Sequence, residues 1–255
     1  DEQFIATGFS GNGFTFGAWA APADLPFAAP WIGYDAATYP QGVLSRASDS
    51  GDFNNDGTPD LAIVSGAQLA VLMADGAGGF HAPVLYPPLL HGRDLEAADF
   101  DGDKDIDVIV CDTGAFYEGT TISLFRNTGD GAFAPPLSYA AGGAASGIAV
   151  ADFNADGAPD VAVAHDRYIE YDNSIAIILN NGVSGSGQGF LSPQVITISV
   201  ATENLDAGDL DGDGDEDLVV AHKTNRITVV RNDGGTTFTA LPRQVGVASL
   251  SPPKG

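Results

Sequence analysis

The chain has 255 residues, 44% of them hydrophobic, with 34 Asp and Glu against 10 Lys and Arg. This apolar content is ample for a packed core, which excludes disorder as the state of the whole chain. The formal net charge of −24 repels nucleic acid and anionic membrane surfaces and attracts cations. No apolar run reaches the roughly 18 residues of a membrane span. We therefore expect no nucleic-acid partner and no membrane insertion.

The composition also favours short strands over helices. The 33 glycines and 15 prolines indicate many tight turns. A single cysteine, Cys111, excludes an intramolecular disulfide framework. The lack of disulfides fits a reducing compartment, and it fits equally an exported bacterial protein that is stabilised by metal instead. The first residue is Asp1 rather than Met, as in either a processed mature form or an excised piece.

Four segments repeat one pattern, in which an apolar strand enters an Asp-rich loop and a β-branched strand leaves it. They are Gly51–Ser65, Ala98–Asp112, Ala151–Asp166 and Gly208–Lys223. Their first aspartates, Asp52, Asp99, Asp152 and Asp209, lie 47, 53 and 57 residues apart. Each is followed by an alternating strand that ends in a Gly-rich turn and a phenylalanine. The β-branched runs predict strands covered on both faces, and four strands per repeat are typical of a propeller blade.

We therefore predict a single all-β domain over residues 1–255, a β-propeller or partial propeller of four full blades plus part-blades at both ends. The full units cover about residues 45–90, 91–143, 144–200 and 201–243, after the tail of a preceding blade and a linker (1–44) and before the start of a following blade (244–255). Either the ends meet and complete a fifth blade, or the chain is a segment of a larger ring, which we favour. In the closed case Val245–Leu250 would be covered by Gly13–Trp19.

Each Asp-rich loop has nine positions, with oxygen-bearing side chains at positions 1, 3, 5 and 9 and glycine at position 6 in three of them. Ligands at alternate positions, a glycine for the turn and a closing carboxylate describe a calcium loop, in which position 7 offers its backbone carbonyl. The predicted metal ligands are Asp52, Asn54, Asp56, Thr58 and Asp60; Asp99, Asp101, Asp103, Asp105 and Asp107; Asp152, Asn154, Asp156, Ala158 and Asp160; and Asp209, Asp211, Asp213, Asp215 and Asp217.

The rival metal sites fit less well. An EF-hand needs a glutamate at position 12, where these loops have Ile63, Val110, Val163 and Val220. Magnesium demands a strict octahedron, and zinc prefers His or Cys. Solvated Asx-turns without metal are the remaining alternative. Because several close carboxylates repel unless a cation neutralises them, we predict about four Ca²⁺, with the second site weakened by Lys104 in the glycine position.

The D-F-[ND]-x-D-G-x-P-D-[LV] loops and N-x-G-x-G-x-F turns resemble the FG-GAP/VCBS repeat family, which includes the calcium-bearing blades of integrin α-subunits. The resemblance covers about 200 of the 255 residues. It implies a β-propeller with Ca²⁺ in the loop between the first two strands of a blade. It implies little about activity, because propellers carry adhesion modules, lectins and a few lyases alike.

The function that we predict is a non-enzymatic, calcium-binding module for adhesion or ligand binding, extracellular as a secreted or cell-surface protein. Its ligand would be a glycan or another protein. Loops on a rigid scaffold often carry binding residues, and two longer, aromatic loops offer candidates. The ligand-binding candidates are Phe116, Tyr117, Arg167, Tyr168 and Tyr171.

Two other functions stay open. A structural propeller segment of a larger surface protein or filament would pair with neighbouring subunits through strand edges at the termini. A carbohydrate-active lyase or hydrolase would need two free carboxylates facing each other, and the carboxylates outside the loops, such as Glu96 and Glu203, show no such pair in the sequence. His165 and His222 hold the same position in their repeats. Either they form a second metal site or an acid–base pair, or, as we favour, they are structural residues of the blades.

Overall fold

The structure is a computed structural model of the full chain. It describes residues 9–10, 13–14, 45–65, 67–86, 89, 91–112, 120–165, 173–181, 189–198, 200–223, 226–241 and 245–246. The chain forms two compact units, Asp1–Leu44 and Ser45–Gly255. In the first unit, β1 (Phe9–Ser10) and β2 (Gly13–Phe14) form an antiparallel pair.

The second unit consists of four antiparallel sheets in which the strands follow one another in chain order. Sheet one contains β3 (Ser45–Gly51), β4 (Asp60–Ser65), β5 (Gln68–Leu72) and β6 (Val84–Tyr86). Sheet two contains β7 (Gly92–Ala98), β8 (Asp107–Asp112), β9 (Thr121–Phe125) and β10 (Leu137–Ala140). Sheet three contains β11 (Ala145–Ala151), β12 (Asp160–His165), β13 (Ser174–Ile178) and β14 (Gln194–Thr197). Sheet four contains β15 (Thr202–Gly208), β16 (Asp217–His222), β17 (Arg226–Asn232), β18 (Phe238–Ala240) and β19 (Val245–Gly246).

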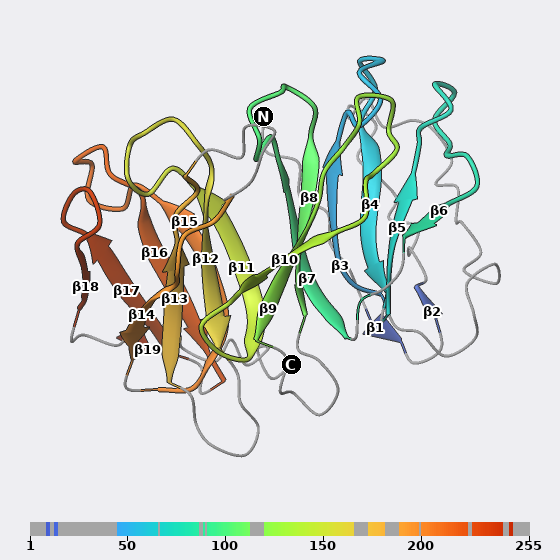
Figure 1. Ribbon diagram of the computed structural model, residues 1–255. Helices are drawn as coiled ribbons and strands as arrows, with labels where there is room; N and C mark the ends of the chain where they lie inside the picture. The colour runs from blue at the N-terminus through green and yellow to red at the C-terminus, as the bar shows by residue number, and fades with distance from the viewer. Residues whose placement is uncertain are drawn as a thin grey trace, which may run out of the picture. The chain divides into compact units, whose positions relative to one another are not determined.

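The first strands of the sheets, β3, β7, β11 and β15, are neighbours in that order, and the sheets follow one another side by side (Figure 1). The described residues form no helix, and thus none that could cross a membrane. Four-stranded antiparallel sheets that pack through their faces, with their first strands adjacent, are blades of a propeller. The prediction of an all-β, partial propeller with four blades is confirmed.

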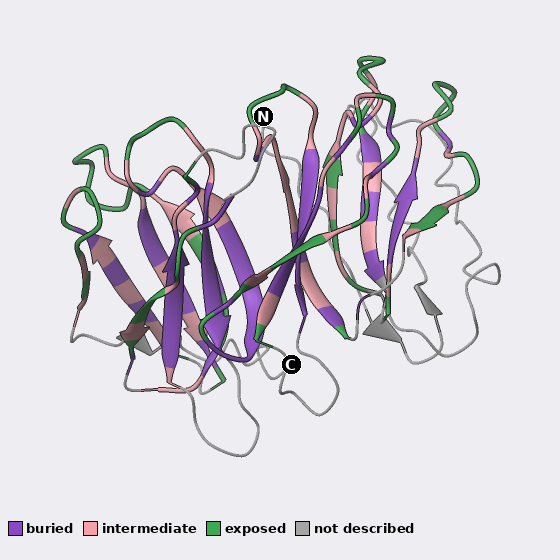
Figure 2. Cartoon of the chain, in the orientation of Figure 1, coloured by how far each residue is buried: buried purple, intermediate pink, exposed green. Residues whose placement is uncertain are grey.

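The core lies between the sheets, in three clusters that each join one sheet to the next. In sheets two and three every residue of the second strands, β8 and β12, is buried (Figure 2). In sheet four the pattern of β16 alternates between buried and half-buried residues, because only one face is packed. The β-branched runs thus lie as predicted where a sheet has neighbours on both sides.

One repeated contact joins each sheet to the following one. Phe53, at the second position of the first loop, packs edge-on against Phe133 of sheet two, with ring centroids 5.6 Å apart. Its backbone carbonyl accepts a hydrogen bond of 2.7 Å from the side-chain amide of Asn127. The same pair of contacts recurs at the other two junctions: Phe100 with Phe190 and Asn180, and Phe153 with Phe238 and Asn232. We call this pair of contacts the Phe–Asn latch.

The C-terminal boundary of the fourth unit differs from the prediction. Val245 and Gly246 pair with Ile227 and Arg226 of β17, so they continue the outer strand of sheet four beyond β18. At these two residues the chain thus extends sheet four, whereas the sequence predicts the start of a following blade. Most residues of the closed-ring alternative, Gly13–Trp19 and Val245–Leu250, lie outside the described residues.

The latch yields a prediction about stability. In sheet three the Asn180 amide donates to the carbonyls of Phe100 (2.8 Å) and Pro159 (3.2 Å), and Asn180 is 1% exposed. The change Asn180→Ala leaves two buried carbonyls without this donor and should lower the free energy of unfolding by about 1–3 kcal/mol. Urea denaturation measures it. The matched control is Asn181→Ala, at an exposed position, which should stay within about 0.5 kcal/mol of the parent. Equal losses in both variants would contradict the latch.

Candidate metal centre

The four Asp-rich loops occupy equivalent places, each joining the first strand of a sheet to the second. Strand pairing brings the ends of each loop together: Gly51 pairs with Asp60, and the same register recurs in the other three sheets. Position 1 therefore follows the first strand directly, and position 9 begins the second. The fold alone holds the first and last predicted ligands of each loop close to each other.

The aspartate at position 9 is buried in every loop, with Asp107 and Asp160 0% exposed. Both of its carboxylate oxygens accept backbone N–H groups. In sheet two, Asp107 Oδ2 accepts from Phe100 (3.0 Å) and Oδ1 from Asn127 (2.8 Å), and the other loops repeat this pattern. Burial raises the pKa of Asp107 to about 7 and that of Asp160 to about 6, against the opposing effect of these hydrogen bonds. Position 9 thus ties the loop to the third strand.

The aspartate at position 1 shapes the loop from inside. Asp52 accepts backbone N–H groups from Asp56 (3.0 Å) and Gly57 (2.8 Å), and Asp99 accepts from Gly102 (2.8 Å) and Lys104 (2.9 Å). Loops three and four repeat these bonds. Each loop is therefore curled around the carboxylate at its first position, as the Asx-turn alternative also requires.

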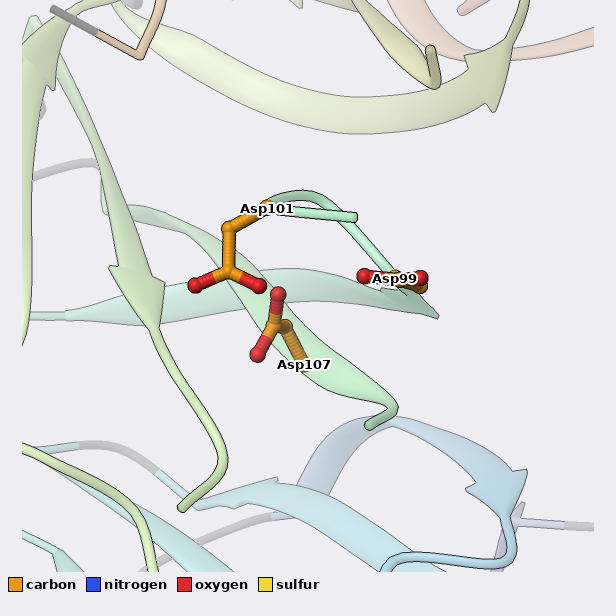
Figure 3. Close-up of side chains that lie close together, drawn as sticks. All are labelled: Asp99, Asp101 and Asp107. Atoms are coloured by element: carbon orange, nitrogen blue, oxygen red, sulfur yellow. The ribbon is translucent and has the colours of Figure 1, made fainter. Parts of the chain in front are cut away.

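The loops fall into two types according to position 3. In the second and fourth loops this residue is an aspartate, and carboxylate oxygens of positions 1, 3 and 9 lie within 4.8 Å of one another: Asp99, Asp101 and Asp107, and Asp209, Asp211 and Asp217. Figure 3 shows the first of these groups, with Asp101 and Asp107 turned toward each other. In the first and third loops an asparagine replaces the aspartate, and its amide donates to position 5, from Asn54 to Asp56 (3.0 Å) and from Asn154 to Asp156 (2.9 Å).

An arginine accompanies each loop with the additional aspartate. Arg126 Nη1 lies 3.7 Å from Asp101 Oδ2, whereas the guanidinium of Arg231 pairs with Asp233. Burial first, and then the charges of Asp213 and Asp217, raise the pKa of Asp211, and the charge of Arg231 opposes this rise. Arg126 and Arg231 both precede the latch asparagine of their sheet. The loops with asparagine have Met73 and Leu179 at this place. The additional negative charge is thus matched by a paired arginine in the second loop, and not in the fourth.

One carboxylate oxygen of the second loop is buried without a partner. Asp101 Oδ1 accepts no hydrogen bond from the described residues, and the side chain as a whole is 11% exposed. Burial and the charge of Asp103 raise the pKa of Asp101. A buried oxygen without a partner is costly, and a divalent cation among three carboxylates would satisfy it. The residues present therefore fit an oxygen-coordinated metal ion.

The remaining loop positions agree with the local geometry that the sequence predicts. Gly57 and Gly157 have φ of 86° and 89°, and Gly214 has φ of 95°. Lys104 stands at the same position with φ of 78°, a left-handed conformation that disfavours side chains. At position 7 the Asp105 side chain accepts from the Asn55 amide of the preceding loop (2.7 Å), while Thr58, Ala158 and Asp215 occupy the equivalent places.

The other predicted site residues are either structural or outside the described part. His165 is 0% exposed and bonds with Ser174 and the Ala141 carbonyl, both at 2.8 Å, and His222 bonds with Thr228 at 2.7 Å. Each histidine thus holds strands of the blades in place. The predicted ligand-binding residues Phe116, Tyr117, Arg167, Tyr168 and Tyr171 lie outside the described residues.

A second group of carboxylates, on the first strands of the sheets, was not predicted as a group. Burial first, and then the charges of Asp49, Asp94 and Asp206, raise the pKa of Glu96 to about 8. Asp49 and Asp94 each accept a backbone N–H from the first strand of the next sheet, at 2.9 and 3.1 Å. The sequence does contain one signal for this group, because Asp49, Glu96 and Asp206 hold the same position in their repeats. Asp49 and Asp94 thus carry contacts from one sheet to the next, while Glu96 lies among like charges.

Comparison with known families agrees with this geometry. The FG-GAP-like repeat matches four consecutive, overlapping stretches, residues 52–110, 99–163, 152–220 and 209–252. The chain belongs to the FG-GAP repeat family. Each stretch begins at the first aspartate of one loop, and the first three run into the following unit, so the Asp-rich loop is the marker of the repeat. The sequence matched none of the curated proteins with which it was compared.

Two solved structures of low sequence identity, with TM-scores above 0.5, share the fold. A Bacteroides uniformis protein, provisionally assigned as a 6-phosphogluconolactonase, is 18% identical with a TM-score of 0.57 over 89% of this chain. An Agrocybe aegerita lectin that recognises non-reducing terminal N-acetylglucosamine is 20% identical with a TM-score of 0.51 over 75% of this chain. BBS1N in complex with ARL6DN is 12% identical with a TM-score of 0.47 over 81% of it. The FG-GAP chain spans 62%, 50% and 58% of their lengths, respectively.

The left-handed residue in the second loop can be tested directly. Because glycine adopts positive φ without steric cost, Lys104→Gly should raise the free energy of unfolding by about 0.5–1 kcal/mol. Urea denaturation without added metal measures the change. Ala77→Gly is the control, since Ala77 is exposed and is not among the positive-φ residues, so that glycine there should destabilise slightly. A loss of stability in Lys104→Gly would contradict backbone strain at this position.

The raised pKa of Glu96 predicts a pH dependence. Because the Glu96 carboxyl binds its proton more tightly in the folded state, proton binding stabilises the fold. This stabilisation is fully present below the pKa of 4.5 in the unfolded chain, and it is lost as the pH rises through the folded pKa of about 8. Glu96→Gln removes the titration, so the variant should match the parent near pH 4 and exceed it in stability near pH 9. Urea denaturation across this range tests it. A constant difference between variant and parent would rule out the raised pKa.

Proposed function

We propose that this FG-GAP protein is a calcium-binding propeller module that acts in binding rather than catalysis. The observation that carries the proposal is the buried Asp101 Oδ1, which has no hydrogen-bond partner among the described residues, within a group of three carboxylates that the fourth loop repeats. The residues that would hold the ions are the oxygen donors at positions 1, 3, 5 and 9 and the backbone carbonyl at position 7. A bound Ca²⁺ would supply positive charge that neutralises the loop and fixes its curvature.

Calcium suits these loops better than its rivals. All the side-chain donors in these loops are oxygen atoms, and in the first and third loops one asparagine takes the place of a carboxylate. Such a set of donors suits a hard cation that accepts irregular geometry. Four Ca²⁺ would change the formal net charge from −24 to −24 + 8 = −16. Loops of extracellular modules have dissociation constants of about 10⁻⁴–10⁻³ M, which only the calcium outside the cytosol would fill. We therefore propose an extracellular location, secreted or at the cell surface.

The binding role follows from what the scaffold offers. A propeller held by metal loops presents the connections between strands on a rigid frame, and rigid frames with variable loops carry recognition. We propose a glycan or a protein as the ligand; the Agrocybe aegerita lectin is a protein of similar fold with a glycan-binding role. A structural role in a larger surface assembly is the second candidate, and the apolar Leu210, half-exposed on a face of sheet four that no described sheet covers, favours it.

Calcium should stabilise the folded chain. A ligand that binds only the folded state adds about 2.7 kcal/mol per site at a hundredfold excess over Kd, so millimolar Ca²⁺ should raise Tm by many degrees relative to EGTA. Isothermal titration calorimetry then gives the stoichiometry, with the second loop expected to bind most weakly. Asp99→Ala should remove one site, whereas Asp130→Ala, in an exposed turn of sheet two, should leave the calcium response intact. Identical melting curves in EGTA and in Ca²⁺ would refute calcium binding.

A further inference from the structure

A hydrogen bond between side chains joins the first Asp-rich loop to the second. The amide of Asn55 donates to Asp105 Oδ1 at 2.7 Å, although the two residues lie 50 positions apart in the chain. Asn55 is position 4 of the first loop and stands between the predicted ligands at positions 3 and 5. Asp105 is position 7 of the second loop, where the backbone carbonyl is the predicted ligand. The bond therefore connects residues of two predicted cation sites directly.

The latch connects every pair of neighbouring loops through their backbones. At the first junction Asn127 donates to the carbonyl of Phe53, in the first loop, and to that of Ile106 (3.1 Å), at position 8 of the second loop. The latch asparagines of sheets three and four bridge the same two positions at the second and third junctions. All three junctions thus share this bridge, and the side-chain bond at the first junction is additional to it.

The first and third junctions hold the aspartate at position 7 in the same surroundings. A Cβ on Gly129, two residues after the latch asparagine of sheet two, would be 2.8 Å from Asp105 Oδ2. A Cβ on Gly234, the equivalent glycine of sheet four, would be 3.6 Å from Asp215 Oδ2. Both aspartates are half-buried. The third junction therefore presents the same acceptor that Asn55 uses at the first.

Position 4 of the preceding loop decides whether this acceptor meets a donor. The residue there has a left-handed backbone in all four loops, with φ of 59° at Asn55 and 58° at Ala155. Asn55 and Ala155 are both exposed, so the side-chain amide is the main difference between them. Ala155 has no donor for Asp215, and at the second junction Gly102 and Ala158 have no polar side chain at all. A side-chain bond from position 4 to position 7 is thus possible at the first junction alone.

We propose that the bond between Asn55 and Asp105 couples the first two loops, so that a divalent cation in one of them raises the affinity of the other. A cation that fixes the second loop would fix Asp105, and with it Asn55 and the ligands on either side of Asn55. The first loop would then lose less conformational freedom when it binds its own ion. The second loop, which Lys104 strains, would gain affinity in return, because coupling between two sites is reciprocal. This inference rests on the calcium binding proposed above.

Repulsion between the ions does not distinguish the junctions. Two cations in neighbouring loops repel each other, and this effect opposes coupling wherever neighbouring loops are filled. The third junction has the same latch and the same aspartate at position 7, without the side-chain bond. Comparing the first junction with the third therefore isolates what the bond contributes.

The experiment measures calcium binding loop by loop, by amide NMR of the full chain. One glycine amide in each loop donates to the aspartate at position 1 and reports the occupancy of that loop: Gly57, Gly102, Gly157 and Gly214. Asp99→Ala removes the second site, and the half-saturating Ca²⁺ concentration at Gly57 then shows how far the first loop depends on it. The titration is repeated with Asn55→Ala, which removes the donor and introduces the residue that the third loop has at this position.

The matched control uses the third junction. Asp209→Ala removes the fourth site, and Gly157 reports the third loop. Ala155→Asn then places an amide opposite Asp215 and should create the coupling that this junction lacks. In the reverse titration at the first junction, Asp52→Ala is followed at Gly102. Its factor must equal that of Asp99→Ala followed at Gly57, whereas local damage from the two substitutions need not be equal.

The proposal expects Asp99→Ala to raise the half-saturating concentration at Gly57 at least about fivefold, and less than about twofold when Asn55→Ala is present. Asp209→Ala should change the value at Gly157 less than about twofold, and clearly more with Ala155→Asn. Equal dependence with and without Asn55→Ala would assign the coupling to the latch and overturn the role of the bond. A first loop whose affinity is unchanged by the loss of the second site would overturn the coupling while calcium binding stands. If calcium moved none of the four amides, the proposed function would be wrong, and the coupling with it.

Discussion

The structure depends on the buried aspartate at position 9 of each loop. In sheet three, Asp160 takes the N–H of Phe153 with one oxygen and that of Asn180 with the other. Phe153 belongs to the metal loop, and Asn180 follows the third strand and donates to the preceding sheet. One carboxylate therefore fixes the loop, the strand beside it and the contact between blades. Without this aspartate the loop would lose its closing residue, and the latch asparagine would lose its position, because these two features depend on the two hydrogen bonds that the carboxylate accepts.

The blade architecture was predictable because its signals are local. Loops such as Asp99–Asp107 and the strand that follows them contain their own turn and burial pattern within about fifteen residues, and the repeat multiplies this evidence. The pairing of Val245 and Gly246 with β17 was not predicted, because a strand of two residues has no pattern of its own in the sequence. The latch was also missed: Asn127 stands in a turn motif, while its partner, the Phe53 carbonyl, lies 74 residues earlier in the chain.

The carboxylates at the sheet junctions were missed for a related reason. In Gly92–Ala98, Asp94 and Glu96 alternate with other residues, a pattern typical of a strand with one solvated face. The first strands of neighbouring blades lie side by side instead, so this face meets the backbone of the next strand. Asp94 finds an N–H donor there, whereas burial first, and then the like charges around it, raise the pKa of Glu96 to about 8. Charge alternation in a sequence cannot distinguish solvent from a neighbouring blade.

The Asp-rich loops treat the charge at position 3 in different ways. The first and third loops have an amide there, whereas the second and fourth keep Asp101 and Asp211. In the second loop Arg126 lies beside Asp101, while in the fourth loop Arg231 pairs with Asp233 instead. Counting positions 1, 3, 5 and 9 together with Arg126, the first three loops each sum to −3 and the fourth sums to −4. The amide of Asn54 bonds with Asp56 within its own loop, whereas Asp101 Oδ1 has no hydrogen-bond partner among the described residues, so the polar atoms at position 3 are satisfied in the first loop and not in the second.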